Sequence, residues 1–208
     1  ERRRGAGAIA LVALLPVAST LLTAAEAEAH PESLVTAAPG LKVSVVSANV
    51  NLGPNIDQMV LWPNDSKPTH LIACNEQGAG QVALQRISLK TGIPENIVSS
   101  GLVSCDPVRA TPWGTILFGE ENGTAGRLFE LLDPLHTTGV IVTGAGAATM
   151  VSDPAHVARR GALGQFAFEG LALMPNGVLY ISDENRPGNG SPGGAMMKFI
   201  PSTLWTGT

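Results

Sequence analysis

The sequence predicts an all-β protein, and within that class a partial β-propeller of about three blades. Glycine (24 residues) and proline (15 residues) are frequent in this chain of 208 residues, and both favour turns between short strands. No segment shows convincing helical periodicity. A third observation, a sequence pattern that recurs along the chain, narrows the prediction from all-β to a propeller.

The recurring sequence pattern is an apolar strand that ends in acidic or amide residues, followed by a glycine turn and a second strand. Its three copies begin with strands at residues 70–74, 115–118 and 178–182, which are followed by Glu76, Glu121 and Glu184. The first interval between these acids is about 45 residues, a usual length for one propeller blade, and the second is longer by an insert at residues 133–163. Because blades surround a central channel, we expect equivalent strand ends to form a ring of carboxylates there.

The expected strands are runs of apolar and β-branched residues between turn residues. Residues 32–55 alternate small apolar and polar residues, which predicts one or two strands. Further strands are expected at residues 59–62, 70–74, 81–89, 115–118, 127–132, 171–174, 178–182 and 195–200. Inside the insert we expect one helical turn, at residues 154–159.

The best-defined pair of strands is a hairpin around Pro175-Asn176-Gly177. Asn and Gly accept the positive φ angles of a type I′ turn, which joins antiparallel strands tightly. Antiparallel pairing about this turn brings Glu169 to the same end as Asp183 and Glu184. That end, opposite the turn, is the candidate site.

The first 29 residues have the pattern of an export signal. Arginines at positions 2–4 precede an apolar run at 6–22, and small residues with A-x-A spacing follow at 25–29. We expect a Sec or twin-arginine signal at residues 1–29 and export to the periplasm or the medium, with no membrane anchor after cleavage. Residues 30–208 then form one partial propeller domain, the N-terminal part of a longer protein that is a monomer at full length.

Composition and motifs exclude several classes of function. The net charge is −4, so the chain lacks the basic surface that nucleic acid requires. The sequence contains no G-x-S-x-G elbow, P-loop or EF-hand loop, which argues against serine hydrolases, nucleotide-cradling proteins and calcium sensors of the EF-hand type.

Carboxylates are the main candidate ligands. Acids from different blades suit Ca²⁺, which takes six to eight oxygen ligands in irregular geometry. The candidates are Glu120, Glu121, Glu169, Asp183 and Glu184. A lone acid at a strand end is usually a solvated turn residue, so the hypothesis depends on the threefold recurrence in a chain with only 14% charged residues.

The two cysteines and two arginines each allow two interpretations. Cys74 and Cys105 either form a disulfide, as in many exported proteins, or supply a thiolate that binds iron beside the acids. Arg109 and Arg186 either clamp a phosphoryl oxygen or pair with a neighbouring acid.

Three stretches resemble the PhoX-type alkaline phosphatases, a family of exported bacterial proteins. They are S-C-D-P at 104–107 with T-P-W-G-T at 111–115 and E-E-N at 120–122, then F-E-G-L-A at 168–172, and L-Y-I-S-D-E-N-R-P at 179–187. The resemblance covers residues 74–201. It implies a six-bladed propeller in which a calcium and iron cluster hydrolyses phosphate monoesters.

The resemblance also implies roles for particular residues. Glu120 or Glu121, together with Glu169, match the metal-bridging glutamates. Asp183 and Glu184 match further calcium ligands, and either Cys74 or Cys105 matches an iron-binding cysteine. The chain departs from the family pattern at Phe168, where a histidine is common, and at Gly119, which replaces a cysteine.

Two functions therefore remain open. The first is a metallophosphatase that acts on small phosphate monoesters, with Glu169, Arg109 and Arg186 in its catalytic site and with this part of the chain inactive alone. The alternative is a calcium-binding propeller of the lactonase type or a non-catalytic binding module, because G-L-A at 170–172 followed by Pro175-Asn176-Gly177 also resembles those propellers.

The signal hypothesis predicts that the exported protein begins near Glu28 or His30, because a signal peptidase cleaves after small residues. N-terminal sequencing of the exported protein checks this. An exported protein that still begins at Glu1 would contradict the hypothesis.

Overall fold

A computed structural model describes residues 35–185, 188 and 193–207 of the chain. The chain divides into two units, residues 1–43 and 44–208. In the first unit the described residues include a turn in which the Leu41 amide donates to the Ala38 carbonyl. The expected signal at residues 1–29 lies outside the described residues. Where the structure is described, it has no helix with the length and apolar character needed to span a membrane.

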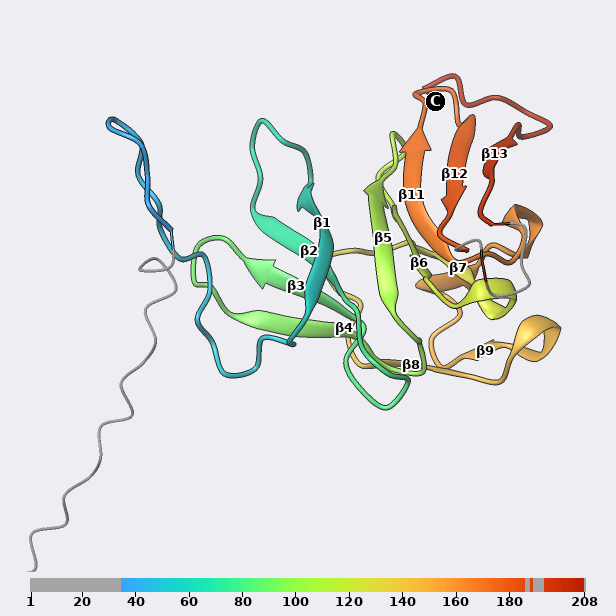
Figure 1. The fold of residues 1–208 in the computed structure, drawn as a ribbon, viewed down its shortest axis with the longest axis horizontal. Coiled ribbons are helices and arrows are strands. Elements are labelled where there is room, and N and C mark those ends of the chain that lie inside the picture. Colours follow the sequence, from blue (N-terminus) through green and yellow to red (C-terminus); the bar gives the residue numbers. More distant parts are fainter. Residues whose placement is uncertain (1–34, 186–187, 189–192, 208) are drawn as a thin grey trace, which may run out of the picture. The chain divides into compact units, whose positions relative to one another are not determined.

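The second unit is all-β, as predicted, and consists of three sheets, none of which closes on itself (Figure 1). The first sheet has the order β1-β2-β3-β4-β8-β9, the second β10-β7-β6-β5 and the third β11-β12-β13. The first four strands are β1 (Ile56–Trp62), β2 (His70–Asn75), β3 (Leu84–Ser88) and β4 (Pro94–Ser100), joined by β8 (Val140–Thr143) and β9 (Met150–Val151). The second sheet contains β5 (Cys105–Ala110), β6 (Ile116–Glu120), β7 (Leu128–Leu131) and β10 (Val157–Arg159). The third contains β11 (Phe168–Leu173), β12 (Leu179–Asp183) and β13 (Met196–Phe199). Short 3₁₀ turns lie at η2 (Gly123–Ala125), η3 (Gly146–Ala148) and η4 (Gly161–Leu163).

Two predicted elements are wrong. The described part of residues 32–55 contains no strand, although its sequence alternates. Val45 and Val46 are exposed, so the alternation has no sheet face to cover and no neighbouring strand to satisfy the backbone. The helical turn expected at residues 154–159 is a turn followed by strand β10, which extends the second sheet by pairing with β7.

The β11–β12 hairpin forms with the predicted pairing, but its turn is of another kind. The Gly177 amide donates to the Met174 carbonyl, and the Met174 amide to the Val178 carbonyl. Gly177 has φ of 87°, whereas Asn176 is not among the residues with positive φ. Because Pro175 presets the φ of the first central residue of a type I turn, the loop is a three-residue type I turn closed by a left-handed glycine.

The second sheet supplies core to both of its neighbours. Ile116 and Phe118 on β6 belong to one apolar cluster shared with the first sheet, and Phe118 stacks on Phe129 with ring centroids 5.5 Å apart. Leu117, which points to the opposite face, belongs to a second cluster with Phe168 and other residues of the third sheet. Strand β6 is therefore buried on both faces, which explains its continuous apolar sequence.

All three sheets begin with the same backbone arrangement. Their first two strands pair in the registers Ile56↔Asn75, Cys105↔Glu120 and Phe168↔Asp183, and each register is followed by a shift at the next paired residue. After each second strand, the amide of a glutamate donates to the carbonyl of the residue before the first strand. These pairs are Glu76 to Asn55 (2.9 Å), Glu121 to Ser104 (2.7 Å) and Glu184 to Ala167 (2.9 Å). The repeat seen in the sequence is thus a repeat in three dimensions.

A buried ion pair holds the loops around the second sheet. Glu120 is fully buried, and its two oxygens accept from the Arg127 guanidinium at 2.6 Å each and from the amides of Val103 and Arg127. Arg127 also donates to the carbonyls of Gly101 and Gly144. The pair therefore joins the entry to β5, the β6–β7 connection and the loop after β8.

Glu120→Ala is expected to lower the free energy of unfolding by about 3–5 kcal/mol, because it leaves the Arg127 charge buried without its partner. Chemical denaturation followed by circular dichroism measures this change. Asp153→Ala is the control, since both side chains of its ion pair with His156 are partly exposed, at 35% for Asp153 and 48% for His156, and a loss of no more than about 1 kcal/mol is expected. Equal losses in the two variants would contradict a structural role for Glu120.

Candidate metal centre

Four carboxylates from the second and third sheets converge on one point. Asp106, Glu121, Glu169 and Glu184 each offer an oxygen, and these four oxygens all lie within 4.8 Å of one another. Asp106 is buried and the other three are half-buried. A cation placed among these oxygens would be within reach of all four groups.

The repeated strand pairing explains why these acids meet. Asp106 on β5 and Glu169 on β11 lie at the register shift of their strands, where two residues oppose one on the partner strand. Such a bulge turns a side chain away from the regular alternation. Glu121 and Glu184 directly follow β6 and β12, so each sheet contributes one acid from each of its first two strands.

Two contacts hold the sheets together beside the acids. A lone antiparallel bridge joins Glu121 to Ala167, which links the second sheet to the third. The amide nitrogen Nε2 of Gln58, on β1, donates to Oδ1 of Asp106 at 3.2 Å and to the carbonyl of Glu169 at 2.7 Å. Gln58 therefore ties all three sheets at this point.

Burial and mutual repulsion raise the pKa values of two acids in the cluster. Burial, followed by a hydrogen bond with Glu169 and the negative charges of Glu169, Asp57 and Glu121, raises the pKa of Asp106 to about 9. Burial, followed by a hydrogen bond with Glu184 and the charges of nearby acids, raises the pKa of Glu121 to about 7. Protons thus take the place that a cation would fill near neutral pH.

The donor set fits a hard cation. All four groups are carboxylates, and Ca²⁺ prefers such oxygens and tolerates several of them in irregular geometry. A soft ion would require sulfur ligands, and none is present in the cluster. The arrangement therefore offers oxygen donors for a divalent cation, and a bound cation would offset the negative charges that contribute to the two raised pKa values.

Of the acids predicted from the sequence, Glu121, Glu169 and Glu184 are brought together and two are not. Glu120 uses both oxygens in its pair with Arg127. Oδ1 of Asp183 accepts from the amides of Ala167 and Asn185 at 3.1 and 3.2 Å, so this residue closes the turn around the end of β12.

The cysteines and arginines also have defined places. Cys74 and Cys105 form a disulfide, so of the two interpretations the structure shows the disulfide, and neither sulfur is a thiolate for iron. Arg109 donates from Nε to the Leu171 carbonyl at 2.8 Å, from β5 to β11. Arg186 lies outside the described residues.

Asp106 is the one acid of the described cluster that was not predicted as a ligand. Asp57 and Glu76 occupy the equivalent positions of the first sheet, near enough to affect the pKa values of Asp106 and Glu121 respectively. A signal existed in the sequence: Asp106 stands as far before Glu121 as Glu169 does before Glu184. Recognising it required aligning the copies on their first strands as well as on their second.

The departures from the family pattern have packing reasons. A Cβ on Gly119 would lie 2.8 Å from Cδ1 of Leu128 and 3.4 Å from Cβ of Phe168. Phe168 is fully buried and meets Phe166 edge to face, with centroids 5.5 Å apart. In this chain both positions serve the apolar contact between the second and third sheets.

Comparison with known proteins gave no match to a protein-family model, a curated protein or a solved structure.

The raised pKa values predict an unusual pH dependence of stability. Without a cation, the folded state binds more protons than the unfolded state between the ordinary pKa of Asp106, 3.8, and its folded value of about 9. The free energy of unfolding should therefore fall as the pH rises through this window. Ca²⁺ at about 100 times its dissociation constant should add about 2.7 kcal/mol, and its affinity should rise with pH because it displaces protons.

Thermal unfolding between pH 5 and 9, with chelator or with Ca²⁺, measures both effects. Asp106→Asn is the control, because it has no proton to release at this position, and it should remove the Asp106 part of the dependence seen in chelator and leave the part that Glu121 contributes. Identical pH profiles in chelator, in Ca²⁺ and in Asp106→Asn would contradict the site.

Proposed function

We propose that this chain is part of an exported metal-dependent phosphatase that hydrolyses phosphate monoesters, as the resemblance to PhoX-type alkaline phosphatases implies. The observation that carries the proposal is the cluster of Asp106, Glu121, Glu169 and Glu184 within 4.8 Å. Three of these acids, Glu121, Glu169 and Glu184, lie at positions that match metal ligands of that family. Asp106 lies in the S-C-D-P motif at 104–107, which also carries the resemblance.

The propeller is the second part of the proposal. Three sheets that begin with the same register, the same bulge and the same glutamate hydrogen bond are the expected appearance of successive blades. Strand β5 packs against both β1 and β11, as the innermost strands of adjacent blades do. The acids stand at equivalent ends of these strands, where a central channel would open.

The chemistry follows from charge. A phosphate monoester is a dianion, and four carboxylates repel it until cations are bound. When bound, metal ions supply Lewis acidity that polarises the phosphoryl oxygens and activates a nucleophile. The four acids hold the cations, and Gln58 fixes Asp106 and the β11 backbone relative to one another. Arg186, two residues after Glu184, and Arg109, three residues after Asp106, are proposed to bind phosphoryl oxygens.

Calcium is the cation that this donor set favours. With the sulfurs of Cys74 and Cys105 joined, iron would have to be held through carboxylate oxygens alone. The disulfide itself supports export, since disulfides persist mainly in oxidising compartments.

Two observations favour the alternative, a calcium-binding propeller of the lactonase type or a binding module. The described cluster contains oxygen donors only, and Arg109 is engaged through Nε with the backbone of β11. Metal analysis and hydrolysis of p-nitrophenyl phosphate by the full-length protein together separate the two. Metal-dependent hydrolysis supports the phosphatase, and bound calcium without hydrolysis supports the alternative.

Glu169→Gln is expected to remove bound metal and to reduce hydrolysis of p-nitrophenyl phosphate by at least about 100-fold, the upper range for changes to the surroundings of a metal ligand. The variant keeps the shape of the side chain and loses its charge, so the fold should persist. Metal content by mass spectrometry and steady-state hydrolysis by the full-length protein check this. Glu95→Gln serves as the control, since Glu95 lies on β4 and is not part of the cluster. A Glu169→Gln protein with unchanged metal and turnover would overturn the site assignment.

A further inference from the structure

A pocket lies between the second and third sheets, away from the acid cluster. Its volume is about 730 Å³, within the range of small-molecule sites. Trp113, in the β5–β6 turn, and Gly177, in the β11–β12 turn, line it, whereas the acids stand at the opposite ends of these hairpins. None of its lining residues belongs to the metal cluster, so the pocket requires its own explanation.

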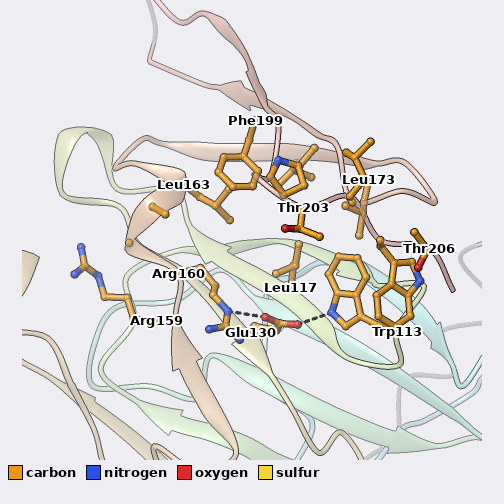
Figure 2. Close-up of a pocket in the computed structure, with 17 residues that line it drawn as sticks. Trp113, Leu117, Glu130, Arg159, Arg160, Leu163, Leu173, Phe199, Thr203 and Thr206 are labelled. Carbon is orange, nitrogen blue, oxygen red and sulfur yellow. Dashed lines mark hydrogen bonds and ion pairs between the residues drawn. The ribbon is translucent and has the colours of Figure 1, made fainter. Parts of the chain in front are cut away.

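The wall of the pocket is mainly aromatic and aliphatic. Leu117 comes from β6, Leu173 and Leu179 from the β11–β12 hairpin and Phe199 from β13, while the segment after β13 contributes Trp205. Trp113 and Trp205 meet edge to face with ring centroids 5.7 Å apart. Figure 2 shows Leu163, Phe199, Thr203 and Leu173 arranged around the open space above Leu117. Such a wall suits a flat, apolar ligand.

The charged groups of the pocket do not balance. Its lining contains one acid, Glu130, and two bases, Arg159 and Arg160. Glu130 already accepts from Nε1 of Trp113 at 2.7 Å, from the Thr115 hydroxyl and from Nε of Arg160 at 2.6 Å. Burial alone would raise the pKa of Glu130, but these hydrogen bonds hold it below its ordinary value. The acid is therefore charged and satisfied.

Arg159, unlike Arg160, has no hydrogen bond to Glu130 among the described contacts. Nε of Arg159 is buried, and no hydrogen-bond partner for it occurs among the residues that the structure describes. A buried donor without a partner costs about 1–3 kcal/mol. In Figure 2 both arginines stand on one side of the pocket and Trp113 on the other, with Glu130 between them. One positive charge at one end of an aromatic cavity is complementary to a single anionic group.

We propose that this pocket binds a small planar aromatic anion, with the ring system between Phe199 and the tryptophans and the anionic group at the Arg159 and Arg160 end. The volume, the aromatic wall and the net positive charge carry this proposal, which stands independently of the metal centre. The pocket recognises the ligand by shape and by one charge, and no chemical step is required of it.

The test uses 8-anilinonaphthalene-1-sulfonate, a planar aromatic anion whose fluorescence rises on binding, with the full chain. Saturable binding of one molecule is expected, together with quenching of the tryptophan emission. N-phenyl-1-naphthylamine, which has similar rings and no charge, should bind at least about tenfold more weakly, since a hydrogen bond to a charged group contributes about 1.5–3 kcal/mol.

Two variants test the location. Arg159→Gln should weaken binding of the sulfonate about tenfold and leave binding of the neutral amine unchanged. Thr203→Trp places a large ring in the open space without removing a wall contact, and it should abolish binding of both dyes. Lys90→Gln removes an exposed positive charge outside the pocket and should change neither. Near-ultraviolet circular dichroism establishes that each variant keeps its packed aromatic groups.

Each contrary result overturns a stated part of the proposal. Equal affinity for the two dyes, or an Arg159→Gln protein that binds the sulfonate normally, overturns recognition of an anion. Normal binding by Thr203→Trp, or the absence of saturable binding in the unmodified chain, overturns the pocket as a ligand site.

Discussion

Repulsion among four carboxylates is the constraint around which the second unit is built. Asp106, Glu121, Glu169 and Glu184 offer oxygens within 4.8 Å of one another, and like charges at this distance oppose folding unless protons or cations intervene. The fold fastens both sheet junctions next to these acids. A disulfide between Cys74 and Cys105 joins the first sheet to the second, and the bridge between Glu121 and Ala167 joins the second to the third.

A division of labour within each repeat keeps the acids in place. In each repeat the residue before the glutamate that follows the second strand lies outside the cluster and secures the chain that enters the first strand. Asn75 donates to the carbonyl of Gly53, Glu120 accepts from the amide of Val103, and Asp183 accepts from the amide of Ala167. One position of the pair serves the fold and the next serves the site, which is why adjacent acids in the sequence have different partners in the structure.

The sequence predicted the all-β class, most strands, the β11–β12 hairpin and three of the four clustered acids, because these depend on local patterns and on one repeat. It could not distinguish Glu120 from Glu121. The two residues differ in the structure because Glu120 faces Arg127 and Glu121 faces the other acids, and the sequence does not show which of them faces Arg127. Asp106 was missed because its place in the cluster depends on a bulge, which shifts a side chain without leaving a mark in the apolar pattern. The strand predicted before β1 was wrong because the exposed residues there alternate as in a strand but have no neighbouring strand to pair with.

The position of the disulfide has a consequence for the proposed cation site when no ion is bound. Cys105 directly precedes Asp106, and Cys74 directly precedes Asn75 and Glu76, and the two cysteines are 31 positions apart in sequence. The cross-link restricts the unfolded chain and holds the first two sheets together whatever occupies the neighbouring oxygens. An emptied site therefore keeps the positions of these acids on the first and second sheets. Occupation of the proposed site then requires little reordering of the chain, so ions would exchange at a preformed site rather than through folding and unfolding of the domain.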